Sequence, residues 1–300
     1  MASQAAPKTH NHQVWLQQDD PEIRIFYTEC EPVSGKSKGT VLLIHGFPET
    51  SHQFRHVIIP LAEAGYYVLA PDYRGAGYSS KPPSGYTKNV LAQDLYEVIH
   101  DKLGIKEKIH IVGHDIGGMI AHAYVAQYPD HVASVNWGEC PLPGTIFYED
   151  TKHTAPLWHF DFHAQTDIAI SLVTGKEKTY LKHFYDRLGQ NPAAFTNEDL
   201  EFYTNHYSSA GALYAGFTTY RMFEEDAKHN LAWKEKNGKV KVRAMIMSGE
   251  QCFMTARAKE MASEMYENLE QGIIKGSGHW LAEENPEDFV KQVLAFVEKN

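Results

Sequence analysis

The sequence lacks several features that mark specialised classes of protein. It has only three cysteines, Cys30, Cys140 and Cys252, and an odd, sparse set of thiols does not build a disulfide framework. No apolar run is long enough to span a bilayer. The opening residues, MASQAAPKTHNHQ, contain no apolar signal core. We therefore expect a reduced, cytoplasmic protein without structural disulfides or a membrane span.

Positive charge is also in deficit. The chain has 28 Lys and Arg against 38 Asp and Glu, a net charge of −10, which argues against nucleic acid or an anionic membrane as a partner. Its hydrophobic content of 43% and charged content of 22% are ordinary for a globular protein. At 300 residues the chain is long enough for one large core with a lid.

The most informative stretch runs through residues 108–129, KIHIVGHDIGGMIAHAYVAQYP. It begins with β-branched residues typical of a strand, continues with apolar residues at helical spacing, and stops at Pro129. Between strand and helix, Gly113 and Gly117 flank Asp115 at a spacing of two, the pattern of a nucleophile elbow. A carboxylate nucleophile attacks carbon rather than an acyl group, which favours opening of a C–O or C–halogen bond. The alternative is an Asp N-cap in an ordinary crossover.

Strands alternate with helices along the chain. We expect strands at residues 23–30, 40–44, 67–71, 132–137, 240–247 and 269–274, and helices at 51–64, 87–103 and 286–298. This alternation predicts an α/β fold with a mostly parallel sheet flanked by helices, whose functional residues follow the carboxyl ends of the strands.

The rhythm of the chain divides it into three parts. Residues 1–20 are polar and expected to be loose. Residues 21–141 and 238–300 form the predicted core. Residues 142–237 contain no run typical of a buried strand and are rich in aromatic residues and histidine, so we interpret them as an inserted helical lid, or cap, domain.

A covalent reaction through Asp115 requires a base to activate water and an acid to orient that base. His279 is the candidate base, since it follows a late strand among glycines and the chain order nucleophile, acid, His is that of α/β hydrolases. The acid has two possible places. Glu139 follows the 132–137 strand and is preferred, while Glu250 follows the 240–247 strand as the fallback. Cys252, where an acid is expected, cannot hold an imidazolium.

Oxyanion donors are predicted after the 40–44 strand, where the chain reads His45-Gly46-Phe47-Pro48. The backbone N–H groups of Phe47 and Ile116 are expected to point at developing negative charge. His45 is given a supporting role, and His114 is interpreted as packing within the elbow.

Four motifs together resemble the soluble epoxide hydrolase and dehalogenase branch of the α/β-hydrolase superfamily. They are HGFPE at 45–49, DYRGAGYS at 72–79, GHDIGG at 113–118 and GSGHW at 276–280. The resemblance covers the chain from about residue 20 and implies the α/β-hydrolase fold with Asp–acid–His machinery. It requires no metal and no organic cofactor.

The lid motifs resemble a microbial subgroup of epoxide hydrolases in which His and Tyr hold the epoxide oxygen. Its WHF-x-F-x-A segment matches residues 158–164, and its F-x-x-Y-R segment matches residues 217–221. The resemblance therefore implies that His159 and Tyr220 are the two donors. The subgroup also carries its acid in an E-x-P-x-P segment, which supports Glu139 over Glu250.

Dehalogenases are the nearest alternative. Haloacetate dehalogenases carry Arg immediately after the nucleophile and again three residues later, where this chain has Ile116 and Met119. Haloalkane dehalogenases usually have Trp after the nucleophile. The His–Tyr pair also resembles the halide-binding groups of fluoroacetate dehalogenases, although their Trp is replaced by Phe160. The sequence thus favours a hydrolase that converts a small hydrophobic epoxide to a vicinal diol, with a dehalogenase or a non-catalytic binding protein as alternatives.

Overall fold

The computed structural model of the protein describes residues 7–16, 22–33 and 35–299. Within them, one sheet of eight strands has the order β1-β2-β4-β3-β5-β6-β7-β8. The pairs β1–β2 and β2–β4 are antiparallel and the remaining pairs are parallel. The strands are β1 (Thr9–Leu16), β2 (Ile23–Cys30), β3 (Thr40–Ile44), β4 (Tyr67–Asp72), β5 (Ile109–His114), β6 (Val132–Gly138), β7 (Ala244–Gly249) and β8 (Leu269–Ile274).

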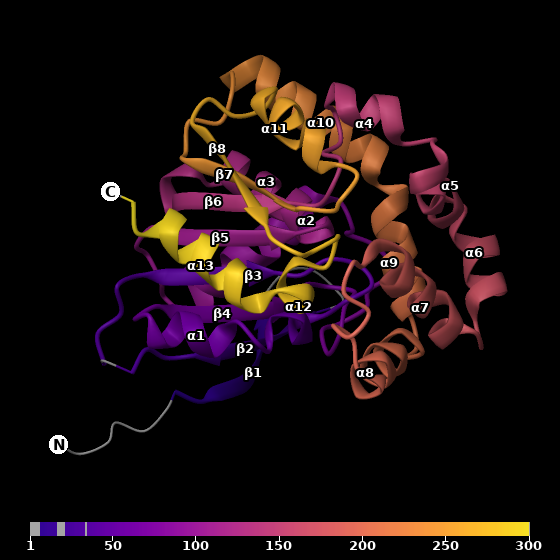
Figure 1. Ribbon diagram of the computed structural model, residues 1–300, viewed down its shortest axis with the longest axis horizontal. Helices are drawn as coiled ribbons and strands as arrows, with labels where there is room; N and C mark the ends of the chain where they lie inside the picture. The colour runs from indigo at the N-terminus through magenta and orange to yellow at the C-terminus, as the bar shows by residue number, and fades with distance from the viewer. Residues whose placement is uncertain (1–6, 17–21, 34, 300) are drawn as a thin grey trace.

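Helices cover both faces of this sheet (Figure 1). Every residue of β3 is buried, as expected for a continuous apolar strand between two helical layers. One hydrophobic cluster joins the sheet to α2, α3 and α11, and a second joins it to α1, α12 and α13. These helices are α1 (Ile58–Glu63), α2 (Lys88–Tyr96), α3 (Ile116–Gln127), α11 (Thr255–Ser263), α12 (Leu281–Glu284) and α13 (Pro286–Val297).

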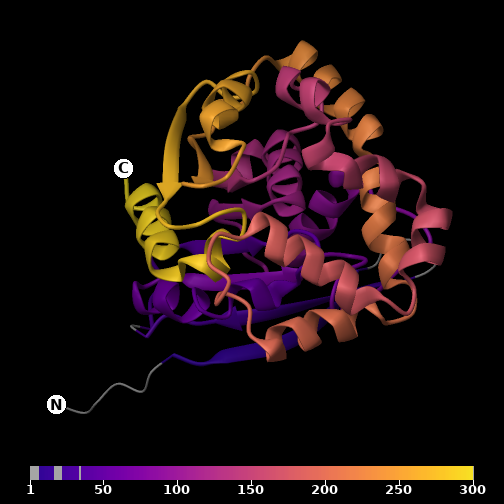
Figure 2. The same ribbon diagram turned by 45° about the vertical axis from the view of Figure 1, so that its right-hand side comes forward.

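A helical insertion, here called the cap, separates β6 from β7. Figures 1 and 2 show it standing beside the sheet rather than covering either face. The insertion confirms the helical character expected for this part of the chain. Its helices are α4 (Ile146–Thr151), η4 (Ala155–Leu157), α5 (Trp158–Ala164), α6 (Thr166–Val173), α7 (Glu177–Leu188), α8 (Asn197–Tyr207), α9 (Ala212–Arg221) and α10 (Phe223–Asn237).

A buried ion pair fastens the cap to the core. The Lys88 ammonium, at the start of α2, lies 2.8 Å from the Asp226 carboxylate of α10, and both side chains are almost inaccessible to solvent. The same ammonium donates to the backbone oxygen of Thr219 at 2.6 Å. Removing one partner of such a pair leaves an uncompensated buried charge, so this contact ties α9 and α10 to the core.

The N-terminal segment differs from the expectation of a loose polar stretch. Residues Thr9–Leu16 form β1, which pairs with β2 along its whole length. Most of its side chains are exposed, so this edge strand shows no apolar alternation from which to predict it. Residues 1–6 and 17–20 of the segment lie outside the described residues.

Several element boundaries also differ from the sequence prediction. The helix expected at 51–64 is two pieces, η1 (Ser51–Phe54) and α1, and the one expected at 87–103 ends in a π-helical turn, η2 (Glu97–Lys102). A short η3 (Pro129–His131) follows α3, and β7 begins at Ala244 rather than residue 240. Among the described residues, no helix combines the length and apolarity needed to cross a membrane.

Candidate active site

Asp115 occupies a strained turn between β5 and α3. Its φ is 53°, a left-handed conformation that non-glycine residues rarely adopt. The flanking glycines make the turn possible, because a Cβ at Gly113 would collide with the backbone of Gly117, and one at Gly117 with the backbone of Ile44. The turn therefore has the close packing expected of a nucleophile elbow. Backbone outliers of this kind concentrate at functional sites.

Two backbone donors hold the Asp115 carboxylate. The N–H of Phe47 donates to its Oδ1 at 2.8 Å, and the N–H of Ile116 also bonds the carboxylate. These are the two amides that the sequence predicts as oxyanion donors. Burial raises the pKa of Asp115, and the nearby His279 together with the two amides opposes that rise. The amides thus favour the ionised carboxylate, the form required of a nucleophile.

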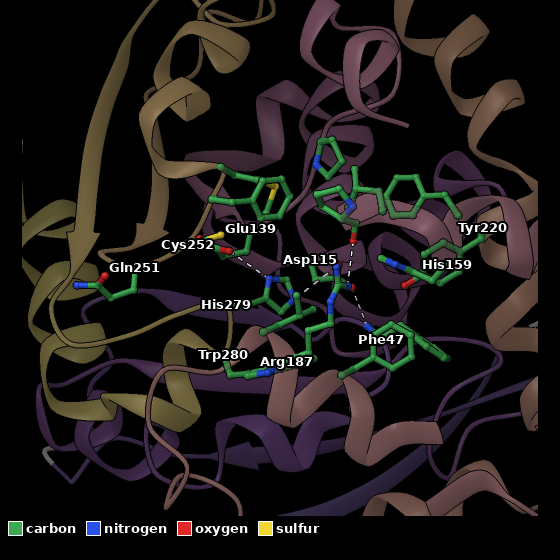
Figure 3. Close-up of a pocket in the computed structure, with 18 residues that line it drawn as sticks. Phe47, Asp115, Glu139, His159, Arg187, Tyr220, Gln251, Cys252, His279 and Trp280 are labelled. Carbon is green, nitrogen blue, oxygen red and sulfur yellow. Dashed lines mark hydrogen bonds and ion pairs between the residues drawn. The ribbon is translucent and has the colours of Figure 1, made fainter. Parts of the chain in front are cut away.

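His279 and Glu139 extend from Asp115 in a row (Figure 3). The His279 Nε2 lies 4.0 Å from Asp115 Oδ2, and its Nδ1 lies 3.1 Å from Glu139 Oε2. The second oxygen of Glu139 accepts the Gly249 N–H at 2.9 Å. Glu139 also has a positive φ, 59°. The carboxylate is therefore fixed in position behind the imidazole, an arrangement that orients the ring and sets its tautomer.

The fallback acid lies elsewhere. Glu250 accepts a hydrogen bond from the Gly276 N–H at 3.0 Å, and no contact joins it to His279 in the described residues. Cys252, at the place where an acid was expected, has its side chain in hydrogen-bond contact with Glu139, and burial followed by the charge of Glu139 raises its pKa. The structure thus brings Glu139, and not Glu250, to His279.

The pKa of His279 is raised. Burial alone would lower it, but the hydrogen bond and charge of Glu139, followed by the charge of Asp115, outweigh the burial. Part of this rise depends on an ionised Asp115. Any reaction that neutralises Asp115 would therefore release the imidazole as a free base at lower pH.

His159 and Tyr220 lie on the other side of Asp115 from the His279–Glu139 pair (Figure 3). Their ring centroids are 5.6 Å apart. Burial, with smaller effects from His279 and Arg187, lowers the pKa of His159 to about 3, so the ring is neutral. Burial and the charge of Asp115 raise the pKa of Tyr220, which keeps its hydroxyl protonated. Both side chains are therefore able to donate a hydrogen bond.

The two remaining histidines named from sequence have packing contacts. His114 donates from Nε2 to the backbone oxygen of His279 at 2.7 Å and accepts from the Gln53 amide at 2.7 Å. His45 is fully buried and stacks on Tyr73 with ring centroids 4.3 Å apart. Neither lines the cavity described next.

The Asp115 carboxylate, the His279–Glu139 pair and the His159–Tyr220 pair all border one cavity of about 170 Å³. Its buried walls are mainly apolar and aromatic, which suits a small hydrophobic ligand. No group of three or more metal-ligating side chains occurs in the described part of the chain. The cavity is lined by Phe47, Asp115, Glu139, Pro141, Pro156, Leu157, His159, Phe160, Phe184, Arg187, Leu188, Tyr220, Gln251, Cys252, Phe253, Met254, His279 and Trp280.

Arg187 is a charged lining residue that the sequence analysis did not predict. It lies in the last turn of α7, where a basic side chain is common because it complements the helix dipole. Nothing in the local pattern separates it from the other basic residues of the cap. Only the folded arrangement places it beside the cavity.

Comparison with known proteins identifies the family of the chain. The profile of the α/β hydrolase fold family matches residues 39–136. The chain is 30% identical to a soluble epoxide hydrolase of Corynebacterium sp. (strain C12), over 88% of this chain and 92% of the relative. It is 26% identical to epoxide hydrolase A of Mycobacterium tuberculosis, over 86% and 89% of the two chains.

A solved structure extends the similarity to three dimensions. The epoxide hydrolase CorEH, without ligand, superposes with a TM-score of 0.84 at 26% identity, covering 96% of this chain and 98% of that one. The similarity therefore includes the cap as well as the sheet. From the site and these relatives together, the chain belongs to the α/β-hydrolase superfamily as an epoxide hydrolase-like member.

Proposed function

We propose that the protein hydrolyses epoxides to vicinal diols through a covalent ester on Asp115. The observation that carries the proposal is the position of the Asp115 carboxylate in the cavity. Two neutral donors, His159 and Tyr220, lie on one side of it, and the His279–Glu139 pair lies on the other (Figure 3). Ring opening and ester hydrolysis require these two sets of groups in turn.

In the first half-reaction, His159 and Tyr220 hold the epoxide oxygen while Asp115 attacks a ring carbon from the opposite side. One C–O bond of the epoxide breaks as the ester C–O bond forms. The departing alkoxide is a poor leaving group, so it must be protonated as the ring opens. Tyr220 supports this step because burial keeps its hydroxyl protonated.

In the second half-reaction, His279 removes a proton from water, and the resulting hydroxide attacks the ester carbonyl of Asp115. The tetrahedral oxyanion accepts hydrogen bonds from the backbone N–H groups of Phe47 and Ile116. The same two groups bond the Asp115 carboxylate in the resting site. Glu139 stabilises the imidazolium at 3.1 Å.

Collapse of the oxyanion breaks the ester C–O bond and releases the diol, whose alcohol oxygen takes the proton from His279. The remaining proton of the attacking hydroxide passes from the Asp115 carboxyl to the Tyr220 phenolate that protonated the first alkoxide, so that the carboxylate and the phenol are both restored.

A single-turnover experiment in H₂¹⁸O tests the two-step route directly. With enzyme in excess over styrene oxide, the proposed route gives unlabelled diol, because the new diol oxygen comes from Asp115. The ¹⁸O then remains on the Asp115 peptide, which mass spectrometry detects. Labelled diol with an unlabelled peptide would mean that water attacks the epoxide directly.

Two variants separate the half-reactions. Asp115→Ala should abolish diol formation because the nucleophile is lost. His279→Gln should still be alkylated but not hydrolysed, so a mass increase equal to one substrate should accumulate on Asp115. Substantial diol from Asp115→Ala, or an unmodified His279→Gln enzyme after incubation, would contradict the proposal.

A dehalogenase is the second candidate, since the His159–Tyr220 pair also suits a departing halide. Incubation with styrene oxide, fluoroacetate and 1-chlorobutane, with diol and halide measured together, distinguishes the two. Halide without diol would assign the pair to halide binding. Failure to trap any adduct on Asp115 with all three compounds would favour a non-catalytic binding protein.

A further inference from the structure

The cavity is closed at one end and open at the other, and the two ends differ in charge. Its lining is buried at Glu139, His159 and Tyr220 and only partly exposed at Asp115. Its exposed lining residues are Pro156, Arg187, Gln251 and Phe253. The exposed set marks the mouth. Among the residues that the structure describes, Arg187 is the single Lys or Arg in the lining of this cavity. A ligand that enters with its reactive end first thus leaves its other end beside a guanidinium.

Two backbone oxygens position the Arg187 guanidinium at the mouth, and its positive charge is not balanced by an ion pair with a described carboxylate. Its Nη1 donates to the backbone oxygen of Pro156 at 3.2 Å and its Nη2 to that of Ala155 at 3.5 Å. No carboxylate in the described residues forms an ion pair with it. In Figure 3 its side chain reaches from α7 toward the labelled cluster. A positioned fork with unused donors is the geometry that recognises a carboxylate.

The positive charge of Arg187 affects a side chain inside the cavity. It is one of the causes, after burial and the charge of His279, of the low pKa of His159. The carboxylates of Asp115 and Glu139 supply negative charge at the closed end. An anionic group is therefore repelled from the closed end and attracted to the mouth, so the two ends together orient a substrate that carries its negative charge away from its epoxide.

The cavity volume limits the length of such a substrate. A dry cavity of about 150 Å³ accommodates benzene, so 170 Å³ holds a body of about one aromatic ring or a short alkyl chain with the epoxide attached. A longer body would extend past Arg187 into solvent. The charge and the epoxide must then lie at opposite ends of a short molecule.

We propose that the substrate is a short epoxide whose far end carries a carboxylate, and that Arg187 binds this carboxylate at the mouth while the epoxide lies at Asp115. The proposal rests on the proposed epoxide hydrolysis for the reacting end only. Arg187 is assigned to specificity, and it takes no part in bond making or breaking.

Two substrates of equal size measure the preference, 4-(oxiran-2-yl)benzoate and the neutral 4-(oxiran-2-yl)benzamide. We expect kcat/KM of the wild type to favour the benzoate on the order of tenfold, as for one added charge-assisted hydrogen bond. The difference should lie in KM, because a group far from the reacting bond interacts equally in ground and transition states. Raising the salt concentration should reduce it.

Variants assign the preference to Arg187. In Arg187→Gln the ratio of the two kcat/KM values should fall to about one, and Arg187→Lys should restore only part of it because a lone ammonium lacks the bidentate fork. Lys182→Gln is the matched control. It removes one positive charge from the same helix, but Lys182 pairs with Asp186 at 2.6 Å and does not line the cavity, so the ratio should stay as in the wild type.

A binding measurement separates failure of this proposal from failure of the proposed reaction. Calorimetry with 4-ethylbenzoate and 4-ethylbenzamide, which have no epoxide, reports recognition without turnover. A benzoate preference that disappears in Arg187→Gln supports the carboxylate site even if no epoxide is converted. Equal binding of the two compounds by the wild type, or a preference retained in Arg187→Gln, overturns it even if diols are formed.

Discussion

Replacing Glu139 with Gln should stop the proposed reaction between its two halves. The side chain is fully buried, with one oxygen 3.1 Å from His279 Nδ1 and the other accepting the Gly249 N–H. A Gln of the same shape has one acceptor and one NH₂ donor for these two sites. If the Gln oxygen keeps the hydrogen bond from the Gly249 N–H, its NH₂ group faces the Nδ1–H of His279. Two donors cannot bond each other, so the ring must carry its proton on Nε2 instead. That nitrogen then cannot accept a proton from water.

The size of the effect follows from burial. Because the exposed fraction of the Glu139 side chain is 0%, no water takes the place of the lost carboxylate. The variant loses the general base, which contributes about 10²–10⁴-fold, or about 3–5.5 kcal/mol in activation free energy. Alkylation of Asp115 does not use His279 as a base, so its rate should change far less. The ester should therefore accumulate.

The pH dependence gives a second signature with a definite sign. In the wild type, Glu139 raises the pKa of His279 against the effect of burial. Without that carboxylate, the pKa of His279 depends on burial and on the remaining charges, and it should fall. The residual turnover that still uses the His279 ring as a base should consequently show its acid limb at lower pH, with a lower plateau.

Rapid-quench kinetics with styrene oxide, combined with intact-protein mass spectrometry, measures these effects. Glu139→Gln should give one rapid equivalent of ester followed by slow diol release. Glu250→Gln is the matched control, since Glu250 bonds Gly276 and does not contact His279. Wild-type turnover with an unchanged acid limb in Glu139→Gln, with loss of turnover in Glu250→Gln, would refute the assignment of the acid.

Three further predictions concern the cap and the buried charges. Lys88→Met should cost about 3–5 kcal/mol in urea unfolding by stranding the Asp226 carboxylate, and adding Asp226→Leu should recover most of it. Burial raises the pKa of Glu49 well above its ordinary value, so the folded state holds a proton that the unfolded state releases and stability falls as pH rises. Glu49→Gln should weaken that dependence at pH values above the ordinary pKa of Glu, and an unchanged slope there would contradict it. Tyr220→Phe should slow alkylation by about 10²–10³-fold, whereas Tyr180→Phe, which loses a hydrogen bond to a neighbouring histidine outside the cavity lining, should change it little.

Much of the fold follows from local pattern. The continuous apolar run of β3 and the strand–glycine–helix sequence around Asp115 both correspond to buried elements. Apolar and small residues are needed there because the elements pack closely on their neighbours. β1 escaped prediction for the opposite reason. It is an edge strand with exposed side chains and gains its order from pairing with β2, which is a property of the sheet rather than of its own residues.

The site divides in the same way. Asp115 and the two amides that bond its carboxylate lie within recognisable motifs, so sequence alone locates them. Arg187 and the packing of His159 against Tyr220 depend on how the cap helices fold together. The sequence around a basic residue at the end of a helix does not indicate whether that residue borders a cavity. The proposed specificity of the site thus depends on tertiary placement, whereas the proposed reaction type follows from local motifs.

The choice between two acids shows why sequence order leaves some alternatives open. β6 and β7 are adjacent, with Gly138 paired to Met247, so the loops that follow them reach the same side of His279. Cys252, in the later loop, already contacts Glu139. If position alone decides which loop supplies the acid, Cys252→Asp in the Glu139→Gln background should restore part of the lost ester hydrolysis. A correctly folded double variant that hydrolyses its ester no faster than Glu139→Gln would show that the orientation fixed by Glu139, and not merely a nearby negative charge, is what His279 requires.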